Sequence, residues 1–302
     1  MTETSRKRIK EKGADANAAP SVMEKTRVKM LCLDLDGTLL TDEKTVSKEN
    51  VNAVQAAYEK GVDIVVATGR QYRKARDFAA CLSLPVTIIA NNGASIRHST
   101  DDRRVYFSPM PMVLAKEIIG LAKDFGIAPI VHVDRYDEGK DIGIGPDVSQ
   151  DVVERYGLLD SDWVFRVDTW SDTALRDAVS MVFFGSRRQI ARWHEHLSQR
   201  FLPPYVMHHL VNLQKFEAML EVLGDTGNKW HGIRELANQK KILPREILAI
   251  GDDNNDIEML KNTGFSFAPK NATQEVKKAA ARVLDQTNNE HAVAAAIEEV
   301  IL

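Results

Sequence analysis

The sequence predicts an α/β protein: a parallel sheet with helices on both faces, interrupted by an inserted domain of different character. Apolar runs alternate with amphipathic helices from residue 28 to about residue 94, and the alternation returns after about residue 216. Runs such as Val28–Leu33 and Val62–Thr68 are apolar almost throughout, which is typical of strands covered on both faces. The segment between the two alternating regions mixes short strands with helices and predicts a separate α+β unit.

The first alternating region is expected to hold three strands and two helices. Ser47 is placed to cap a helix with an apolar stripe at Val51, Val54 and Tyr58, and Gly61 is placed to end it. The other expected elements are the strands Val28–Leu33, Val62–Thr68 and Val86–Asn91 and the helix Gln71–Leu82, which Pro85 separates from the third strand.

Strands and helices are also expected in the inserted segment and in the second alternating region. In the inserted segment the expected strands are Val105–Phe107, Ile130–Val133, Val179–Phe184 and Val206–His209, and the expected helices are Val113–Phe125, Ser149–Tyr156 and Arg188–Gln199. The second alternating region is expected to contain, in order, helix Asn228–Gln239, strand Ile247–Ile250, helix Asp256–Asn262, strand Phe265–Ala268, helix Thr273–Ala281, strand Arg282–Leu284 and helix Glu290–Ile301. These patterns predict a doubly wound, Rossmann-like core of residues 27–94 and 212–302 and an inserted α+β domain of residues 95–211. Residues 1–26 have little to bury and are expected to be a disordered tail.

The composition excludes several functional classes. The chain has 302 residues, of which 44% are hydrophobic, and its formal net charge of −3 gives no global attraction for nucleic acid. No apolar run approaches a membrane span and no secretory signal core is apparent, so a cytoplasmic location is expected. Cys32 and Cys81 are interpreted as reduced packing residues. The basic run Arg6–Lys10 is interpreted as solvated, with a targeting signal as the alternative.

Asp34 and Asp36 stand at the carboxyl end of the first expected strand, within the run Leu31–Leu40. In an open parallel sheet this end faces the ligand-binding crevice, and residues two apart in an extended chain point the same way. Two close carboxylates repel each other unless a cation or a proton intervenes, and a hard divalent ion suits their oxygens. An Asp-Gly turn with solvated acids is the alternative.

Three further polar clusters are expected at the same crevice. Thr68 and Gly69 end the second strand, where a hydroxyl and a close backbone suit a phosphate. Lys229 opens a helix, and helix N-termini favour anions. The oxygen-rich run Gly251–Asp256 follows another buried strand. The alternative for Thr68 and Gly69 is an ordinary turn, and the alternative for Lys229 is a solvated side chain. For the run Gly251–Asp256 the alternative is a helix cap. Because the carboxyl ends of parallel strands converge, we expect one common site.

These strings resemble the haloacid dehalogenase superfamily, and more finely its Cof-type phosphatases with a C2B cap. The run Asp34–Leu39 resembles the first family motif, Thr68 the second, Lys229 the third and Gly251–Asp256 the fourth. The strings similar to the Cof group are Ala67–Arg70, Asn92–Ala94 and Gly251–Leu260, and the resemblance covers residues 27–302. Trp230 stands where relatives usually carry a small residue, and it is interpreted as packing beneath its helix.

The resemblance implies hydrolysis of phosphate monoesters through an aspartyl-phosphate. Asp34 is then the nucleophile, and Asp36 is the general acid and base with a pKa raised toward neutrality. Mg²⁺ is implied on an Asp34 oxygen, the Asp36 carbonyl and Asp252, with Asp256 orienting its waters. The implied substrate-binding residues are Thr68, Gly69, Arg70, Asn92, Gly93, Lys229 and Asn255, of which Thr68 and Lys229 also take catalytic roles by neutralising the transferring group.

The expected function is a Mg²⁺-dependent phosphatase acting on a small phosphorylated metabolite, with sugar phosphates as candidates. A phosphomutase resembling the phosphomannomutases is the alternative on the same chemistry, and a non-catalytic regulatory or binding protein is a third hypothesis. The expected partners are the small-molecule substrate and at most a second copy of the chain, with no nucleic acid and no membrane. In the inserted domain the candidates for substrate contact, each with packing or solvation as its alternative, are Arg97, His98, His132 and Arg135.

Overall fold

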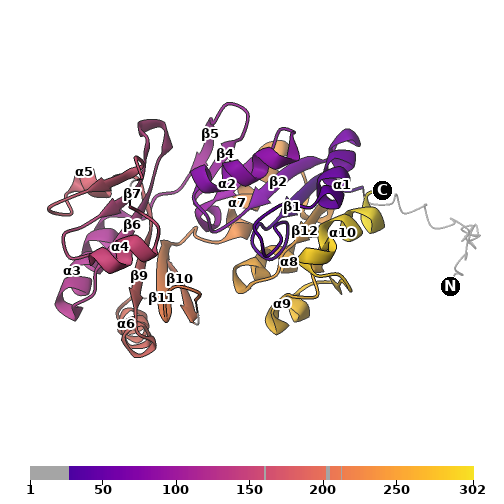
Figure 1. Ribbon diagram of the computed structural model, residues 1–302. Helices are drawn as coiled ribbons and strands as arrows, with labels where there is room; N and C mark the ends of the chain where they lie inside the picture. The colour runs from indigo at the N-terminus through magenta and orange to yellow at the C-terminus, as the bar shows by residue number, and fades with distance from the viewer. Residues whose placement is uncertain (1–26, 160, 202–204, 212) are drawn as a thin grey trace, which may run out of the picture.

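Two sheets organise the chain, one of eight strands and one of six (Figure 1). The computed structural model describes residues 27–302 except 160, 202–204 and 212, so the expected tail of residues 1–26 lies outside the described residues. The larger sheet lies on the right of Figure 1 and the smaller on the left. No helix in the described part of the chain is long and apolar enough to cross a membrane.

The eight-stranded sheet forms the core domain, with the strand order β14-β13-β12-β1-β2-β3-β4-β5. Its strands are β1 (Met30–Leu33), β2 (Asp63–Ala67), β3 (Thr87–Ala90), β4 (Ser95–His98), β5 (Arg104–Phe107), β12 (Ile247–Ile250), β13 (Phe265–Ala268) and β14 (Arg282–Val283). Pairing is parallel from β14 through to β3 and antiparallel for β4 and β5. The expected α/β core with a parallel sheet is confirmed.

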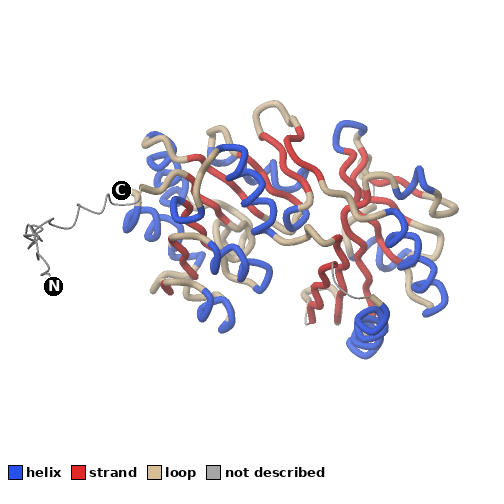
Figure 2. The backbone as a smooth tube through the Cα atoms, turned by 180° about the vertical axis from the view of Figure 1, so that it is seen from behind, coloured by secondary structure: helices blue, strands red, loops and turns tan. Residues whose placement is uncertain are grey.

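Helices cover both faces of this sheet, as the tube view from behind shows (Figure 2). On one face lie α1 (Lys48–Glu59), α2 (Tyr72–Ala79) and α10 (Ala292–Val300); on the other lie α7 (Lys229–Lys240), α8 (Ile257–Asn262) and α9 (Gln274–Ala279). Ser47 caps α1 as expected, because its side chain accepts a hydrogen bond from the backbone N–H of Asn50. The double covering explains why the core strands are apolar along their whole length.

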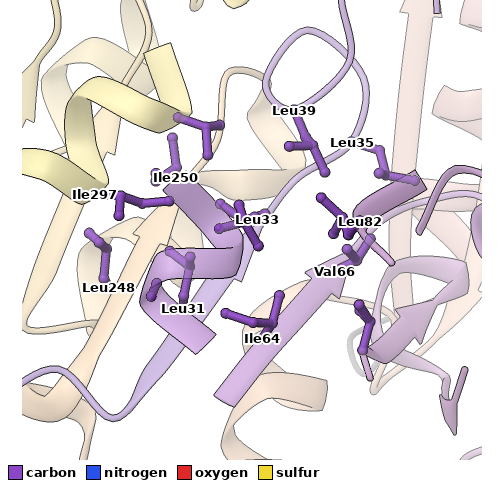
Figure 3. Close-up of a cluster of buried hydrophobic side chains, with 14 of the residues drawn as sticks. Leu31, Leu33, Leu35, Leu39, Ile64, Val66, Leu82, Leu248, Ile250 and Ile297 are labelled. Atoms are coloured by element: carbon purple, nitrogen blue, oxygen red, sulfur yellow. The ribbon is translucent and has the colours of Figure 1, made fainter. Parts of the chain in front are cut away.

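Strand β1 shows how its sequence builds two hydrophobic cores at once. Leu31 and Leu33 point into the cluster under α1, α2 and α10, which Figure 3 shows, while Met30 and Cys32 point into the cluster under α7 and α8. This alternation follows from the two-residue period of a strand. Each such buried aliphatic side chain contributes about 1.5–3 kcal/mol relative to exposure. The strand that ends at Asp34 is therefore firmly anchored.

The six-stranded sheet forms the cap domain, with the strand order β10-β11-β9-β6-β7-β8. Its strands are β6 (Pro129–Arg135), β7 (Lys140–Ile144), β8 (Val164–Arg166), β9 (Ala178–Gly185), β10 (Tyr205–Val211) and β11 (Ala218–Gly224). Its helices are α3 (Met112–Phe125), α4 (Gln150–Arg155), α5 (Asp172–Leu175) and α6 (Arg187–Arg200). Helices α3 and α6 pack on one face of the sheet, which leaves much of the other face toward the core domain.

Both predicted boundaries of the inserted domain, at residues 95 and 211, are wrong. Strands β4 and β5 extend the core sheet beside β3, and β11 pairs antiparallel with both β9 and β10 of the cap sheet. The cap domain therefore spans α3 to β11, residues 112–224. Of the three strands β4, β5 and β11 the sequence predicted only β5, and it placed the residues of all three in the wrong domain, because the apolar pattern of a strand identifies its buried face but not its pairing partner.

Candidate active site

A cavity of about 260 Å³ lies between the carboxyl ends of the core strands and the uncovered face of the cap sheet. Its core wall contains Asp34 after β1, Thr68 after β2 and Asn92 after β3, and the loop after β12 supplies residues 253–255. Its cap wall contains His132, Tyr156, Val182, His208, Leu210, Met219 and Glu221. The structure thus brings the clusters expected at strand ends to one place, and adds a second wall to them.

Lys229 is not among the residues that line the cavity, but it contacts the core wall through Asp34. Asn228 caps α7, so that Lys229 is the first residue of the helix, and its side chain is only 1% exposed. Its Nζ lies 2.5 Å from Asp34 Oδ1 and 2.6 Å from Asp256 Oδ1. Burial alone would lower the pKa of Lys229, but the carboxylates of Asp256 and Asp34 outweigh burial and raise it. The lysine is therefore charged, and the alternative of a solvated lysine is wrong.

Three carboxylates surround a position suited to a metal ion. Asp34, Asp252 and Asp256 each offer an oxygen, and these oxygens lie within 4.8 Å of one another. Burial, together with the neighbouring acids, raises the pKa of Asp34 and, to about 6, that of Asp252, while the charge of Lys229 opposes both effects. A cation bound among the three acids would favour their ionised forms. A set of carboxylate oxygens without thiolate or imidazole fits a hard cation such as Mg²⁺.

Hydrogen bonds hold these carboxylates in place. Thr38 Oγ1 donates to Asp252 Oδ1 at 2.7 Å. Asp256 Oδ2 accepts from the backbone N–H groups of Asp252 and Asp253 at 2.9 and 3.1 Å, while its other oxygen faces Lys229. Asp256 therefore both caps the turn before α8 and positions the lysine. Gly37 is required here, because a Cβ at its position would lie 2.3 Å from an Asp252 oxygen.

Asp36 differs from its prediction. Arg70 donates to both of its oxygens at 2.6 Å, from Nε and Nη2, and Lys44 Nζ lies 2.8 Å from Oδ1. Burial opposes ionisation, but these hydrogen bonds and charges prevail and lower the pKa of Asp36 to about 2. The expectation of a raised pKa is therefore wrong for this state of the site. The sequence could not show that two cations from other segments converge on this carboxylate, whose side chain lies outside the cluster of three acids.

The loops after β2 and β3 complete the core wall. Thr68 Oγ1 accepts a hydrogen bond from the backbone N–H of Arg70 at 3.1 Å, which leaves its hydroxyl proton available to donate. Asn255 Nδ2 donates to Asn92 Oδ1 at 2.9 Å. A Cβ on Gly93 would lie 2.2 Å from the carbonyl oxygen of Asn228. The glycine thus allows the loop after β3 to pack closely against the start of α7.

Among the residues that sequence reasoning weighed in the inserted domain, only His132 lines the cavity. Arg97 instead pairs with Asp134 and Asp137, and Arg135 donates to backbone carbonyls of residues 173, 174 and 176. His98 lies 3.2 Å from the hydroxyl of Thr87 on the neighbouring strand.

Lys44, Tyr156, His208 and Glu221 are among the site residues that sequence reasoning missed. The available signal for Glu221 was a single acid inside the apolar run Ala218–Gly224. Trp230 packs against the core cluster beneath α7, as expected.

The fold and the site define a class of enzyme: a doubly wound core with acidic residues at its strand ends, covered by a cap domain inserted into the core. A family model described as haloacid dehalogenase-like hydrolase matches residues 31–297. The chain belongs to that family.

Several proteins resemble the chain along nearly its whole length. The Bacillus subtilis 5-amino-6-(5-phospho-D-ribitylamino)uracil phosphatase YitU is 26% identical over 91% of this chain and 98% of its own. The Escherichia coli phosphatase YbjI, named for the same substrate, is 27% identical over 91% and 96%. A crystal structure of a haloacid dehalogenase-like hydrolase from Bacteroides thetaiotaomicron superposes with a TM-score of 0.75 at 23% identity, covering 91% of this chain and all of that one. The expected class, a haloacid dehalogenase-like phosphatase of the Cof type, is confirmed.

Proposed function

We propose that this protein is a Mg²⁺-dependent phosphatase that hydrolyses a phosphate monoester of a small metabolite through an aspartyl-phosphate on Asp34. One observation carries the proposal: Asp34 lies in the cavity, bound to the buried Lys229, and is one of three clustered carboxylates. A nucleophilic carboxylate requires positive charge nearby before a phosphate dianion can approach it. The lysine supplies part of that charge, and Mg²⁺ held by Asp34, Asp252 and Asp256 would supply the rest.

Each residue on the core side of the site takes one role in the proposed reaction. An Asp34 oxygen attacks phosphorus, the bond from phosphorus to the leaving oxygen breaks, and that oxygen takes a proton from Asp36. Lys229 and the Thr68 hydroxyl neutralise the transferring group. Water then releases phosphate from Asp34, and Asp36 accepts its proton.

Asp36 must carry a proton when the alcohol leaves, although Arg70 and Lys44 keep it ionised in the structure described here. A bound phosphate dianion competes for Arg70. When Arg70 turns to the phosphate, Asp36 loses its strongest hydrogen bonds and its pKa rises. We therefore propose that substrate binding itself prepares the general acid.

Three relatives are named for 5-amino-6-(5-phospho-D-ribitylamino)uracil, so this compound is the first substrate to test, followed by hexose and pentose phosphates. The assay measures release of inorganic phosphate by the full-length protein with Mg²⁺, and after removal of metal with excess EDTA. We expect turnover only with the metal. Full activity without divalent ions would refute the metal requirement. Isomerisation of a sugar phosphate without release of phosphate would favour the phosphomutase alternative.

A further inference from the structure

The cap wall of the cavity is built from one face of the cap sheet. Glu221 on β11 pairs across the strands with Val182 on β9 and with His208 on β10, so these three residues form a row. All three line the cavity, together with His132 from β6 and Tyr156, which follows α4. This wall faces the strand ends that carry Asp34, and a leaving group attached to phosphate at Asp34 therefore contacts it.

The charge of this wall is unusual for a site that binds an anionic substrate. Among the described residues of the cap, no lysine or arginine lines the cavity. Burial, with a smaller effect from the charge of Lys74 on α2, lowers the pKa of His132 to about 3, and burial together with Lys229 lowers that of His208, which favours the neutral form of both imidazoles. Glu221 is the one acid among the described cap residues that line the cavity. Burial raises its pKa to about 7, and no cation among the described residues offsets that effect.

Hydrogen bonds fix the Glu221 carboxyl relative to the catalytic loops. Asn92 Nδ2 donates to Glu221 Oε2 at 3.2 Å, and Asn92 Oδ1 accepts from Asn255 Nδ2 at 2.9 Å. Because the two bonds use opposite ends of the Asn92 amide, the amide cannot turn without losing both. The carboxyl therefore holds a set position with respect to the loops after β3 and β12.

The wall also contains polar atoms that the protein leaves without a partner. Within the described residues, His132 Nδ1 and His208 Nε2 are buried and accept or donate no hydrogen bond, while His132 Nε2 lies 3.1 Å from the Tyr156 hydroxyl. Buried polar atoms without partners are unfavourable. Both belong to residues that line the cavity, so a ring that turns toward a ligand hydroxyl would gain a hydrogen bond whichever tautomer is present.

We propose that the cap wall selects phosphate monoesters with an uncharged, hydroxylated leaving group, and that Glu221 rejects leaving groups that carry a carboxylate or a second phosphate. This inference rests on the proposed function and specifies its substrate. On the cap side of the cavity an anionic group meets the Glu221 carboxylate and two neutral imidazoles, while Arg70 lies on the core side and Lys74 Nζ lies 5.8 Å from the centre of the Tyr156 ring. A hydroxyl instead donates to Glu221 or bonds to an imidazole. Rejection by an unfavourable charge is an efficient source of specificity.

The test compares two acyclic six-carbon substrates, sorbitol 6-phosphate and 6-phosphogluconate, which differ by a terminal CH₂OH against a carboxylate. The assay is run at pH 8, where Glu221 is mostly ionised. We expect the wild-type protein to favour sorbitol 6-phosphate in kcat/KM by about tenfold or more. Glu221→Gln keeps an acceptor for Asn92 and removes the charge. It should reduce the preference by at least about threefold, mainly through a lower KM for 6-phosphogluconate.

Glu195→Gln on the exposed side of α6 is the matched control and should leave the ratio unchanged. A merely structural role of Glu221 would change both substrates equally, so the ratio is the decisive measurement. If both compounds turn over slowly, their inhibition constants against a better substrate give the same ratio. Equal use of both compounds by the wild type, or an unaltered ratio in Glu221→Gln, would overturn the inference while leaving the phosphatase intact. Failure to release phosphate from any phosphate monoester would instead refute the proposed function.

Discussion

Lys229 and Arg97 are both 1% exposed, and each is held by two carboxylates, yet they belong to different parts of the molecule. Lys229 bonds to Asp34 and Asp256, all within the core domain and beside the cavity. Arg97 lies on β4 of the core domain, and it bonds to Asp134 on β6 and to Asp137 just beyond, both in the cap domain. One buried cation serves the reaction, and the other joins the two domains.

The chemistry of the two side chains suits these tasks. The amine of lysine is a compact point charge, appropriate for an oxygen that must be free to attack, whereas the planar guanidinium of arginine holds several acceptors in a fixed geometry. Asp134 also accepts a hydrogen bond from the Ser95 hydroxyl and lies 3.8 Å from Arg104 Nη1, so its carboxylate contacts three core residues. A buried ion pair alone therefore does not identify an active site; its position beside a cavity does.

The largest effect is expected from Asp34→Asn. This change keeps the shape of the side chain and removes the nucleophile, so kcat should fall by about 10⁴-fold or more. Phosphate release and the melting temperature are measured together, with Asp101→Asn in an exposed turn as the control. Activity within about tenfold of the wild type would rule out a covalent role for Asp34.

Lys229→Met should reduce kcat by about 10²–10³-fold, the usual consequence of losing one electrostatic contact to the transferring group. Lys229→Arg serves as the comparison, because it retains the charge but not the shape of the ammonium group. Rates are measured well below the melting temperature of each variant. An unchanged kcat in Lys229→Met would place the lysine, like Arg97, among purely structural cations.

Arg97→Met tests the other side of the comparison. It leaves Asp134 buried without its main partner, so the free energy of unfolding should fall by about 3 kcal/mol, while kcat of the folded protein changes little. Denaturant unfolding measures the loss, and the double variant Arg97→Met, Asp134→Asn should recover part of it. A large fall in kcat of the folded variant without destabilisation would contradict a docking role.

The smallest expected effect is the contribution of His132 to the pH dependence of the free energy of unfolding. Its folded-state pKa of about 3 lies below the ordinary value of 6.5, so the unfolded chain binds a proton that the folded chain excludes. Its contribution to stability is therefore present above pH 6.5 and is lost as the pH falls below that value. Between pH 7.5 and 5.5 the wild type should lose about 1.4 kcal/mol more than His132→Gln. The exposed His209→Gln should follow the wild type, and parallel curves for all three proteins would contradict the prediction.

Much of the fold could be predicted because the signals are local. The apolar run before Asp34, the serine cap at Ser47 and the helix that begins at Lys229 follow from neighbouring residues alone, and all three appear in the structure. The site could be located for the same reason, since its residues follow strands whose carboxyl ends must converge. The residues of β4, β5 and β11 were assigned to the wrong domain, and β4 and β11 were not predicted as strands, because strand pairing depends on distant partners.

The sequence by itself determined the parallel core and the set of acids and the lysine at its edge, because strand period, helix caps and strand-end positions are properties of adjacent residues. Only the tertiary structure decided the charge state of Asp36, which depends on Arg70, 34 positions away. It also decided the presence of Glu221 beside Asn92, 129 positions away. Burial and electrostatic energy depend on distance in space, and no local pattern contains that distance.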